Sequence, residues 1–195
     1  YGNNIDELCA DLTHQKCSTE TAQEIILSRI YQGLDKVIQD SFAIFSLADV
    51  GLSPDEIAIL LSQSLNISTN KAVIYLRKMR ATGAVEAFGN KTLKVHDALR
   101  ALGLIHLNLL DEEVIQTSLI TLKDLIFSSL HKDRDTSRIA LLIQVFIKLN
   151  DVMALISISG EELFYELGIN TDIMASIELA LNSDALEAEH KFWAL

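Results

Sequence analysis

The spacing of apolar residues follows a helical period along nearly the whole chain and changes to a strand period only once. Apolar side chains recur three or four positions apart, for example at Ile115, Leu119 and Leu122, which predicts helices with one buried stripe each. Between Gly83 and Val95 the apolar and polar residues instead alternate. One proline and eight glycines in 195 residues supply too few turns for an all-β protein. We therefore predict a mainly α fold that contains a single short β-hairpin.

The clearest helix start is the tetrapeptide Ser-Pro-Asp-Glu at residues 53–56. It places a hydroxyl at the N-cap, proline at the first helical position and glutamate where it can reach back to the cap amide. The next helix ends at Thr82-Gly83, where glycine can adopt the left-handed C-cap conformation. A helix beginning near Asp35 precedes both. Three helices followed by a hairpin is the winged-helix pattern, a helix-turn-helix variant, and we predict such a domain over residues 36–100.

The predicted hairpin, the wing, has strands at residues 84–88 and 91–95. Val85, Leu93 and Val95 are expected to point inward, and Gly89-Asn90 is expected to form a two-residue turn. Helical periodicity then resumes through residues 101–195, in short helices joined by short links. We predict a helical repeat-like domain there, built from stacked helical hairpins.

The net charge of −11 is unevenly distributed. Residues 1–51 carry −5 (8 acids, 3 bases), residues 52–100 carry +3 (4 acids, 7 bases) and residues 101–195 carry −9 (15 acids, 6 bases), which sum to −11. Acidic chains repel polyanions, so nucleic-acid binding by the chain as a whole is disfavoured and only the middle segment remains a candidate.

Residues Lys71, Tyr75 and Lys78 are spaced to share the outer face of the third helix, which in a DNA-binding winged helix enters the major groove. The full set of candidate DNA-binding residues is Lys71, Tyr75, Arg77, Lys78, Arg80, Lys91 and Lys94. The alternative interpretation is a solvated face whose bases pair within the molecule. We favour that alternative, because strongly acidic segments flank this one.

Motifs for catalysis or cofactor binding are absent from the sequence. It has no phosphate-binding loop, no glycine-rich dinucleotide motif, no His-Glu-x-x-His and no Gly-x-Ser-x-Gly. Cys9, His14 and Cys17 supply only three of the four ligands of a structural zinc, so we interpret them as ordinary side chains. We expect a chain that is not an enzyme and that holds no metal or cofactor. Two cysteines and no apolar run near 20 residues favour a cytoplasmic protein without a membrane span.

Three segments together resemble a known family: Phe45-Ser-Leu47, Gly51-Leu-Ser-Pro-Asp-Glu-Ile57 and Val95-His-Asp-Ala-Leu-Arg100. They look like the winged-helix region of the STAND-class (NB-ARC/NACHT-like) signalling P-loop ATPases. In that family a Met-His-Asp motif follows the wing, and its histidine reaches the nucleotide held in the neighbouring P-loop domain. Val95 stands at the position of the methionine. The resemblance implies that His96 is the nucleotide-contacting residue.

The same resemblance implies a domain order. Residues 1–35 would end a helical lobe that follows the P-loop domain, and residues 101–195 would begin a sensor or connecting superhelix. We expect the chain, which opens at Tyr1 rather than at Met, to be part of a longer protein. Its function would be regulation through contacts between domains and with partner proteins.

Two other hypotheses stay open. One is a winged-helix transcription regulator with a helical effector or dimerisation domain, and the other is a purely helical scaffold. For His96 itself, an imidazole at a helix start can donate to a phosphate oxygen. The alternative is a surface histidine beside an N-cap at Asp97. His106, His131 and His190 are interpreted as ordinary surface or half-buried residues.

Overall fold

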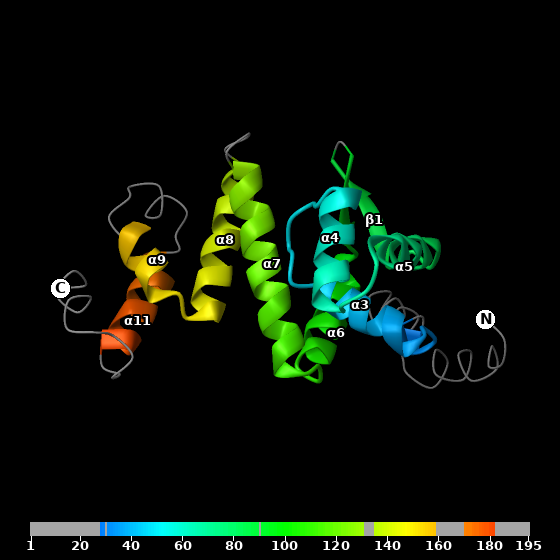
Figure 1. Ribbon diagram of the computed structural model, residues 1–195, viewed down its shortest axis with the longest axis horizontal. Helices are drawn as coiled ribbons and strands as arrows, with labels where there is room; N and C mark the ends of the chain where they lie inside the picture. The colour runs from blue at the N-terminus through cyan, green and yellow to red at the C-terminus, as the bar shows by residue number, and fades with distance from the viewer. Residues whose placement is uncertain (1–27, 30, 90, 131–134, 159–169, 182–195) are drawn as a thin grey trace, which may run out of the picture. The chain divides into compact units, whose positions relative to one another are not determined.

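The computed structural model describes residues 28–29, 31–89, 91–130, 135–158 and 170–181, and these are mainly helical, as predicted (Figure 1). The described residues form 8 helices and one two-stranded sheet. The chain divides into two compact units, and the division falls between Ser118 and Leu119, inside helix α7. Each unit has its own apolar core and is described separately.

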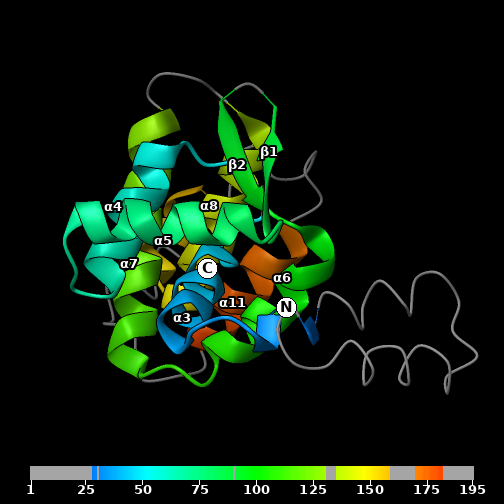
Figure 2. The same ribbon diagram turned by 90° about the vertical axis from the view of Figure 1, so that its right-hand side faces the viewer.

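Unit 1 contains the predicted order of three helices, a hairpin and a further helix. Its elements are α3 (Lys36–Phe45), α4 (Pro54–Ser64), α5 (Thr69–Ala81), β1 (Val85–Phe88), β2 (Thr92–Val95), α6 (Asp97–Leu107) and the start of α7 (Glu112–Leu130). Helix α3 packs mainly on α6, and α4 packs on α5. Figure 2 shows α5 leading directly into the hairpin.

The core of unit 1 forms around α3. Phe42, Ile44 and Phe45 of this helix are completely buried, as are Leu61 of α4 and Met79 of α5. Burying side chains of this size is the main favourable term in folding, at about 1.5–3 kcal/mol each. The apolar periodicity of the sequence therefore marks the faces that hold the helices together.

The predicted helix signals of this unit are confirmed in atomic detail. The Ser53 amide donates to Glu56 Oε2 at 2.7 Å, and the Glu56 amide donates to Ser53 Oγ at 3.2 Å, which completes the capping box. Gly83 has φ +76° after the end of α5, the left-handed conformation expected there.

The two strands of the hairpin are present, but the predicted two-residue turn is wrong. Phe88 pairs with Thr92, so three residues, 89–91, separate the paired strands, and Thr92 Oγ1 donates to the Phe88 carbonyl. This register places Val85 opposite Val95, both buried, whereas a two-residue turn would have placed Val85 opposite Lys94. Burial of one face fixes the register, because a slip of one residue exposes the apolar side chains.

Helix α6 approaches α3 closely at Gly103. A Cβ built on Gly103 would lie 2.8 Å from Ser46 Cβ and 2.9 Å from Phe42 Cε1, and it would also collide with Ser46 Oγ. Ser46 is completely buried, and its hydroxyl donates to the Phe42 carbonyl at 2.8 Å. Ser46 is therefore not free to move aside, and the helices can approach this closely only because residue 103 has no side chain.

Unit 2 comprises the rest of α7 together with α8 (Thr136–Leu149), α9 (Val152–Ile158) and α11 (Asn170–Leu181). Helix α9 packs on both α8 and α11. Asp135 caps α8 by accepting from the Ser137 amide at 2.9 Å, and Asn150 ends it with φ 52°. No described helix combines the length and apolarity needed to cross a bilayer.

We predict that Gly103→Ala destabilises the protein by up to about 2 kcal/mol. Alanine improves helix propensity by roughly 1 kcal/mol, but overpacking a buried contact costs about 1–3 kcal/mol. The measurement is the midpoint of urea unfolding followed by circular dichroism. Ser46→Gly in the same chain removes both Ser46 atoms that the new Cβ would meet and should restore most of the loss. A Gly103→Ala midpoint equal to or above that of the unaltered protein would contradict the close approach.

Candidate functional site

His96 lies at the exit of the hairpin, where β2 ends and α6 begins. Its amide donates to the Ala84 carbonyl at 3.0 Å, which ties the end of the hairpin to the start of β1. Its Nδ1 accepts from the Ala98 amide at 3.3 Å, so His96 is the N-cap of α6. The alternative in which Asp97 is the N-cap is therefore wrong, because Asp97 is the first residue of the helix.

This capping contact fixes how the imidazole can interact with a ligand. A ring nitrogen that accepts a hydrogen bond carries no proton, so in the neutral ring the proton is on Nε2. Nε2–H is then a donor, and the half-exposed side chain forms no other hydrogen bond with the described residues. Because the site is also a helix N-terminus, its electrostatics favour an anion such as a phosphate oxygen.

Asp97 and Lys94 form an ion pair beside His96. Lys94 Nζ lies 2.8 Å from Asp97 Oδ1 and 5.4 Å from the centre of the Phe88 ring. The hydrogen bond from Lys94 is the largest cause that lowers the pKa of Asp97, and the positive charge of Lys94 is the second. Asp97 therefore stays ionised in the first turn of the helix. Lys94 of the hairpin is thus paired with the first residue of α6.

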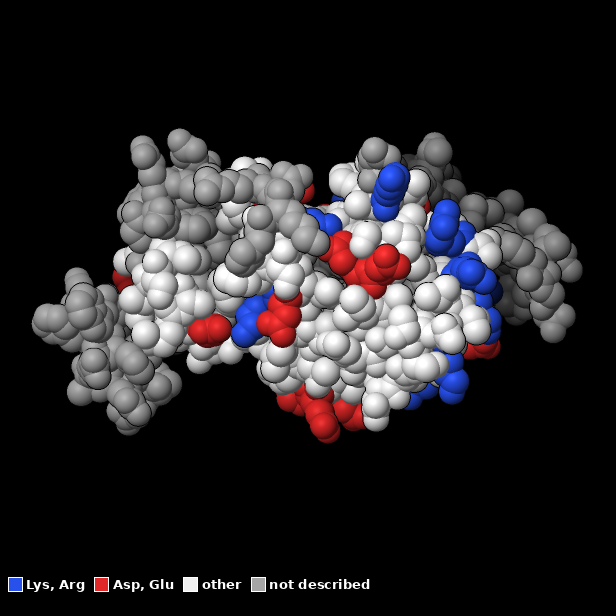
Figure 3. All heavy atoms as spheres, turned by 45° about the horizontal axis from the view of Figure 1, so that its top comes forward, with Lys and Arg blue, Asp and Glu red and all other residues white. Residues whose placement is uncertain are grey.

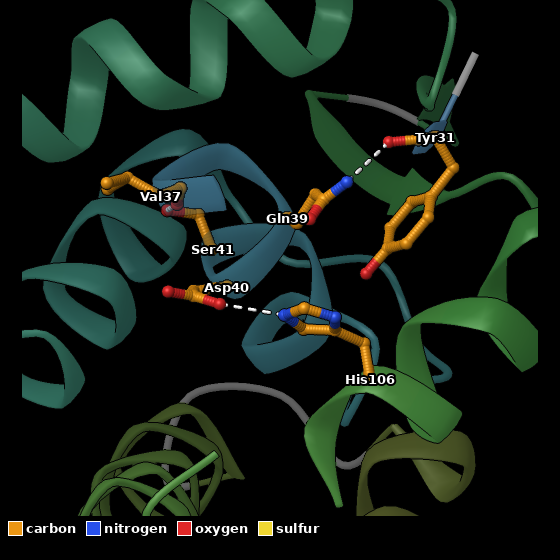
Figure 4. Close-up of polar contacts among 6 residues, drawn as sticks. All are labelled: Tyr31, Val37, Gln39, Asp40, Ser41 and His106. Carbon is orange, nitrogen blue, oxygen red and sulfur yellow. Dashed lines mark hydrogen bonds and ion pairs between the residues drawn. The ribbon is translucent and has the colours of Figure 1, made fainter. Parts of the chain in front are cut away.

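Helix α6 is held on α3 at three levels, and this determines where His96 lies. Nearest His96, Arg100 Nε donates to the Ser46 carbonyl at 3.1 Å. Gly103 makes the close approach described above. Farther along, His106 Nε2 lies 2.7 Å from Asp40 Oδ1, and both side chains are mostly buried (Figure 4). His106 was interpreted from the sequence as ordinary, because its partner is 66 positions away and no local pattern indicates it.

Tyr31 completes the cluster around His106. Its ring packs edge-on against Phe42, with centroids 5.4 Å apart, and against His106 at 5.9 Å. Its hydroxyl is buried, extends toward the Asp40–His106 pair and has no hydrogen-bond partner among the described residues (Figure 4). Burial, and secondarily the negative charge of Asp40, raises the pKa of Tyr31 to about 12.

The candidate DNA-binding residues separate into two groups. Lys71, Arg77 and Arg80 on α5 and Lys91 in the hairpin turn are exposed and form no ion pair with any described residue. Figure 3 shows Lys and Arg side chains gathered along one side of unit 1, over α5. In the second group, Tyr75 is half-buried, Lys78 lies 3.6 Å from Asp35 with both side chains exposed, and Lys94 pairs with Asp97.

The expected pairing of bases within the molecule therefore holds for Lys78 and Lys94 but not for the other cations. An exposed pair such as Lys78–Asp35 contributes about 0–1 kcal/mol and separates readily. Five of these candidate cations consequently remain accessible to an anionic partner.

Metal ligation has no support in the described part of the chain, where no three His, Cys, Asp or Glu residues lie close enough to hold an ion. Cys9, His14 and Cys17 lie outside the described residues, as do His131 and His190.

A scan against protein-family models finds no match to this chain. Searches of curated proteins and of solved structures find none either.

We predict that one of the four tyrosines ionises only near pH 12, because burial raises the pKa of Tyr31 from 10.0 to about 12. Folding then favours the protonated phenol, so this contribution to stability is complete below about pH 10 and is lost as the pH rises toward 12. Tyrosinate absorbance in a pH titration measures the ionisation directly.

Tyr31→Phe provides the control. It should remove the late-titrating group while leaving stability at neutral pH unchanged or slightly higher, because the hydroxyl that it deletes is buried without a hydrogen-bond partner among the described residues. Four tyrosines that all titrate together near their ordinary value would show that Tyr31 is not buried.

Proposed function

We propose that this chain is a non-catalytic regulatory part of a STAND-like ATPase. Residues 36–100 act as a winged-helix domain that packs on a nucleotide-binding domain, and the following helices mediate protein contacts. The observation that carries the proposal is the position of His96, which caps α6 at the exit of the hairpin and whose Nε2–H donor has no partner among the described residues.

The order of elements supports the same proposal. Three helices, a hairpin and a helix that begins at Asp97, the last residue of the Val-His-Asp tripeptide, follow the family's order. The close seating of α6 on α3 holds the imidazole in one place relative to unit 1. A donor held in this way can sense whether a phosphate group of the nucleotide is present, because the hydrogen bond forms only when both modules are docked.

We predict that His96→Asp in the full-length parent protein increases the dissociation rate of bound ADP by about tenfold or more. Aspartate can still cap α6, but it has no donor and its charge repels the phosphate. The matched control is His96→Asn, which also caps the helix and retains an N–H donor. Its ADP dissociation rate should rise much less than that of His96→Asp. Stopped-flow displacement of a fluorescent ADP analogue measures both rates.

Equal ADP retention in the Asp, Asn and unaltered proteins would contradict the role of His96. The sequence upstream of Tyr1 in the parent gene gives an independent check, since the proposal requires a phosphate-binding loop there. A parent that lacks this loop would exclude the family itself.

A second candidate function, a winged-helix DNA-binding regulator, is favoured by one observation. Unpaired exposed cations are present on both α5 and the hairpin turn, the two elements with which a winged helix contacts DNA.

If this second function holds, Lys78→Glu together with Arg80→Glu should weaken binding to a labelled DNA duplex by at least about tenfold and reduce its salt dependence. Lys148→Glu, a reversal of an exposed lysine on α8, is the control with the same change in charge per site. Fluorescence anisotropy over a salt series is the measurement. No binding to any duplex at low salt would exclude this function.

A further inference from the structure

Helix α5 concentrates positive charge without an acid of its own to balance it. The described part of unit 1 contains nine bases and ten acids, and α5 holds four of the bases, Lys71, Arg77, Lys78 and Arg80, and none of the acids. All four are exposed, and of the four only Lys78 forms an ion pair with a described residue, the exposed Asp35. An anionic partner can therefore gain charge pairs here that the described part of the chain does not supply.

An exposed isoleucine lies in the middle of these cations. Ile74 is 49% exposed, Lys71 precedes it by three positions, and Arg77 and Lys78 follow it by three and four. Residues at these intervals lie on the same side of a helix, and the buried residues of α5 lie on the other side. The outer face of α5, defined by Ile74 and these three cations, thus combines an apolar centre with a positive rim.

We propose that the outer face of α5 docks a short acidic helix of a partner protein, in which one apolar side chain is flanked by carboxylates. A central apolar contact with charge pairs around it is the usual composition of a protein–protein contact. The complementary helix places a leucine against Ile74 and glutamates three and four positions from that leucine, opposite the cations. The face does not include His96, so this proposal is independent of the ATPase function proposed above.

The charges of the hairpin favour a short acidic helix over a DNA duplex. A duplex bound by a winged helix contacts both the recognition helix and the wing. The wing here offers little attraction, because Lys94 is paired with Asp97 and exposed Lys91 is offset by exposed Glu86. The excess of positive charge is thus confined to α5. Phosphates also gain nothing from Ile74, whereas an apolar side chain of a protein does.

The size and charge of the face determine the strength of binding and its response to salt. One helix face is far smaller than a stable protein–protein interface, so the contact is weak and reversible. Its charge pairs lie at the surface, where salt screens them. Binding therefore weakens as salt is added, but a part that depends on Ile74 remains at high salt.

The test is fluorescence anisotropy of a labelled probe titrated with the whole chain. The probe is a helical peptide of about 14 residues that carries one leucine, with glutamates three and four positions to either side. We expect a dissociation constant on the order of 100 µM at low salt and about tenfold weaker binding in about 0.5 M salt. Replacing the leucine by alanine, or the glutamates by glutamines, should each weaken binding by about threefold or more.

Variants of the chain separate the apolar contact from the charges. Ile74→Ala should weaken binding of the probe by about fivefold, because it removes the apolar centre and leaves every cation in place. Its matched control is Ile105→Ala on α6, an isoleucine that is 63% exposed and lies outside the face, which should change nothing. Arg77→Gln together with Lys78→Gln should weaken binding by about tenfold, and Lys148→Gln on α8 is the control for charge. All these side chains are exposed, so circular dichroism should show unchanged folding.

A labelled DNA duplex titrated in parallel distinguishes the two kinds of partner. A duplex that binds more tightly than the peptide, with an affinity that Ile74→Ala does not change, would overturn the proposal in favour of DNA. No peptide binding up to about 1 mM, or equal losses in Ile74→Ala and Ile105→Ala, would also overturn it. Amide chemical shifts give a readout that needs no variant: the peptide should shift amides of α5, and shifts confined to other elements would contradict the proposed face.

Discussion

The close approach of α6 to α3 at Gly103 is the contact on which the arrangement of unit 1 depends. With no side chain at residue 103, the backbone of α6 lies against Ser46 and Phe42, both completely buried. The polar contacts Arg100–Ser46 and His106–Asp40 lie on either side of this point and can form only at that separation. Packing of this density has discrete solutions, so α6 cannot slide on α3 without losing all three contacts at once.

This seating determines where the N-terminal end of α6 lies. Since the N-terminus of α6 is the end of the hairpin, fixing α6 also fixes His96 and its Nε2–H donor. Arg100 and His106 turn toward α3 and find their partners there.

Interactions between residues close in sequence account for the parts of the fold that could be predicted. The capping box of Ser53 and Glu56 and the left-handed Gly83 each involve neighbours within a few positions, so their residue types are sufficient to indicate them. The length of the hairpin turn was predicted wrongly because it is decided by burial of Val85 against Val95, not by the residues of the turn. The N-cap of α6 is likewise decided by the path of the chain out of β2. That path makes His96 the N-cap and Asp97 the first residue of the helix.

The cluster of Tyr31, Asp40 and His106 shows why the remainder of the site is not predictable from periodicity. Its three residues come from separate segments, and His106 lies on a helix whose apolar positions give no indication that one polar group will turn inward. The ion pairs are not predictable from periodicity for the same reason: each pair requires an acid that the fold brings close to the base. Asp35 and Asp97 lie within reach of Lys78 and Lys94, whereas Lys71, Arg77 and Arg80 have no described acid near enough to pair with. The net charge of a segment therefore indicates how many cations it carries, but only the folded chain determines which of them remain to meet a partner.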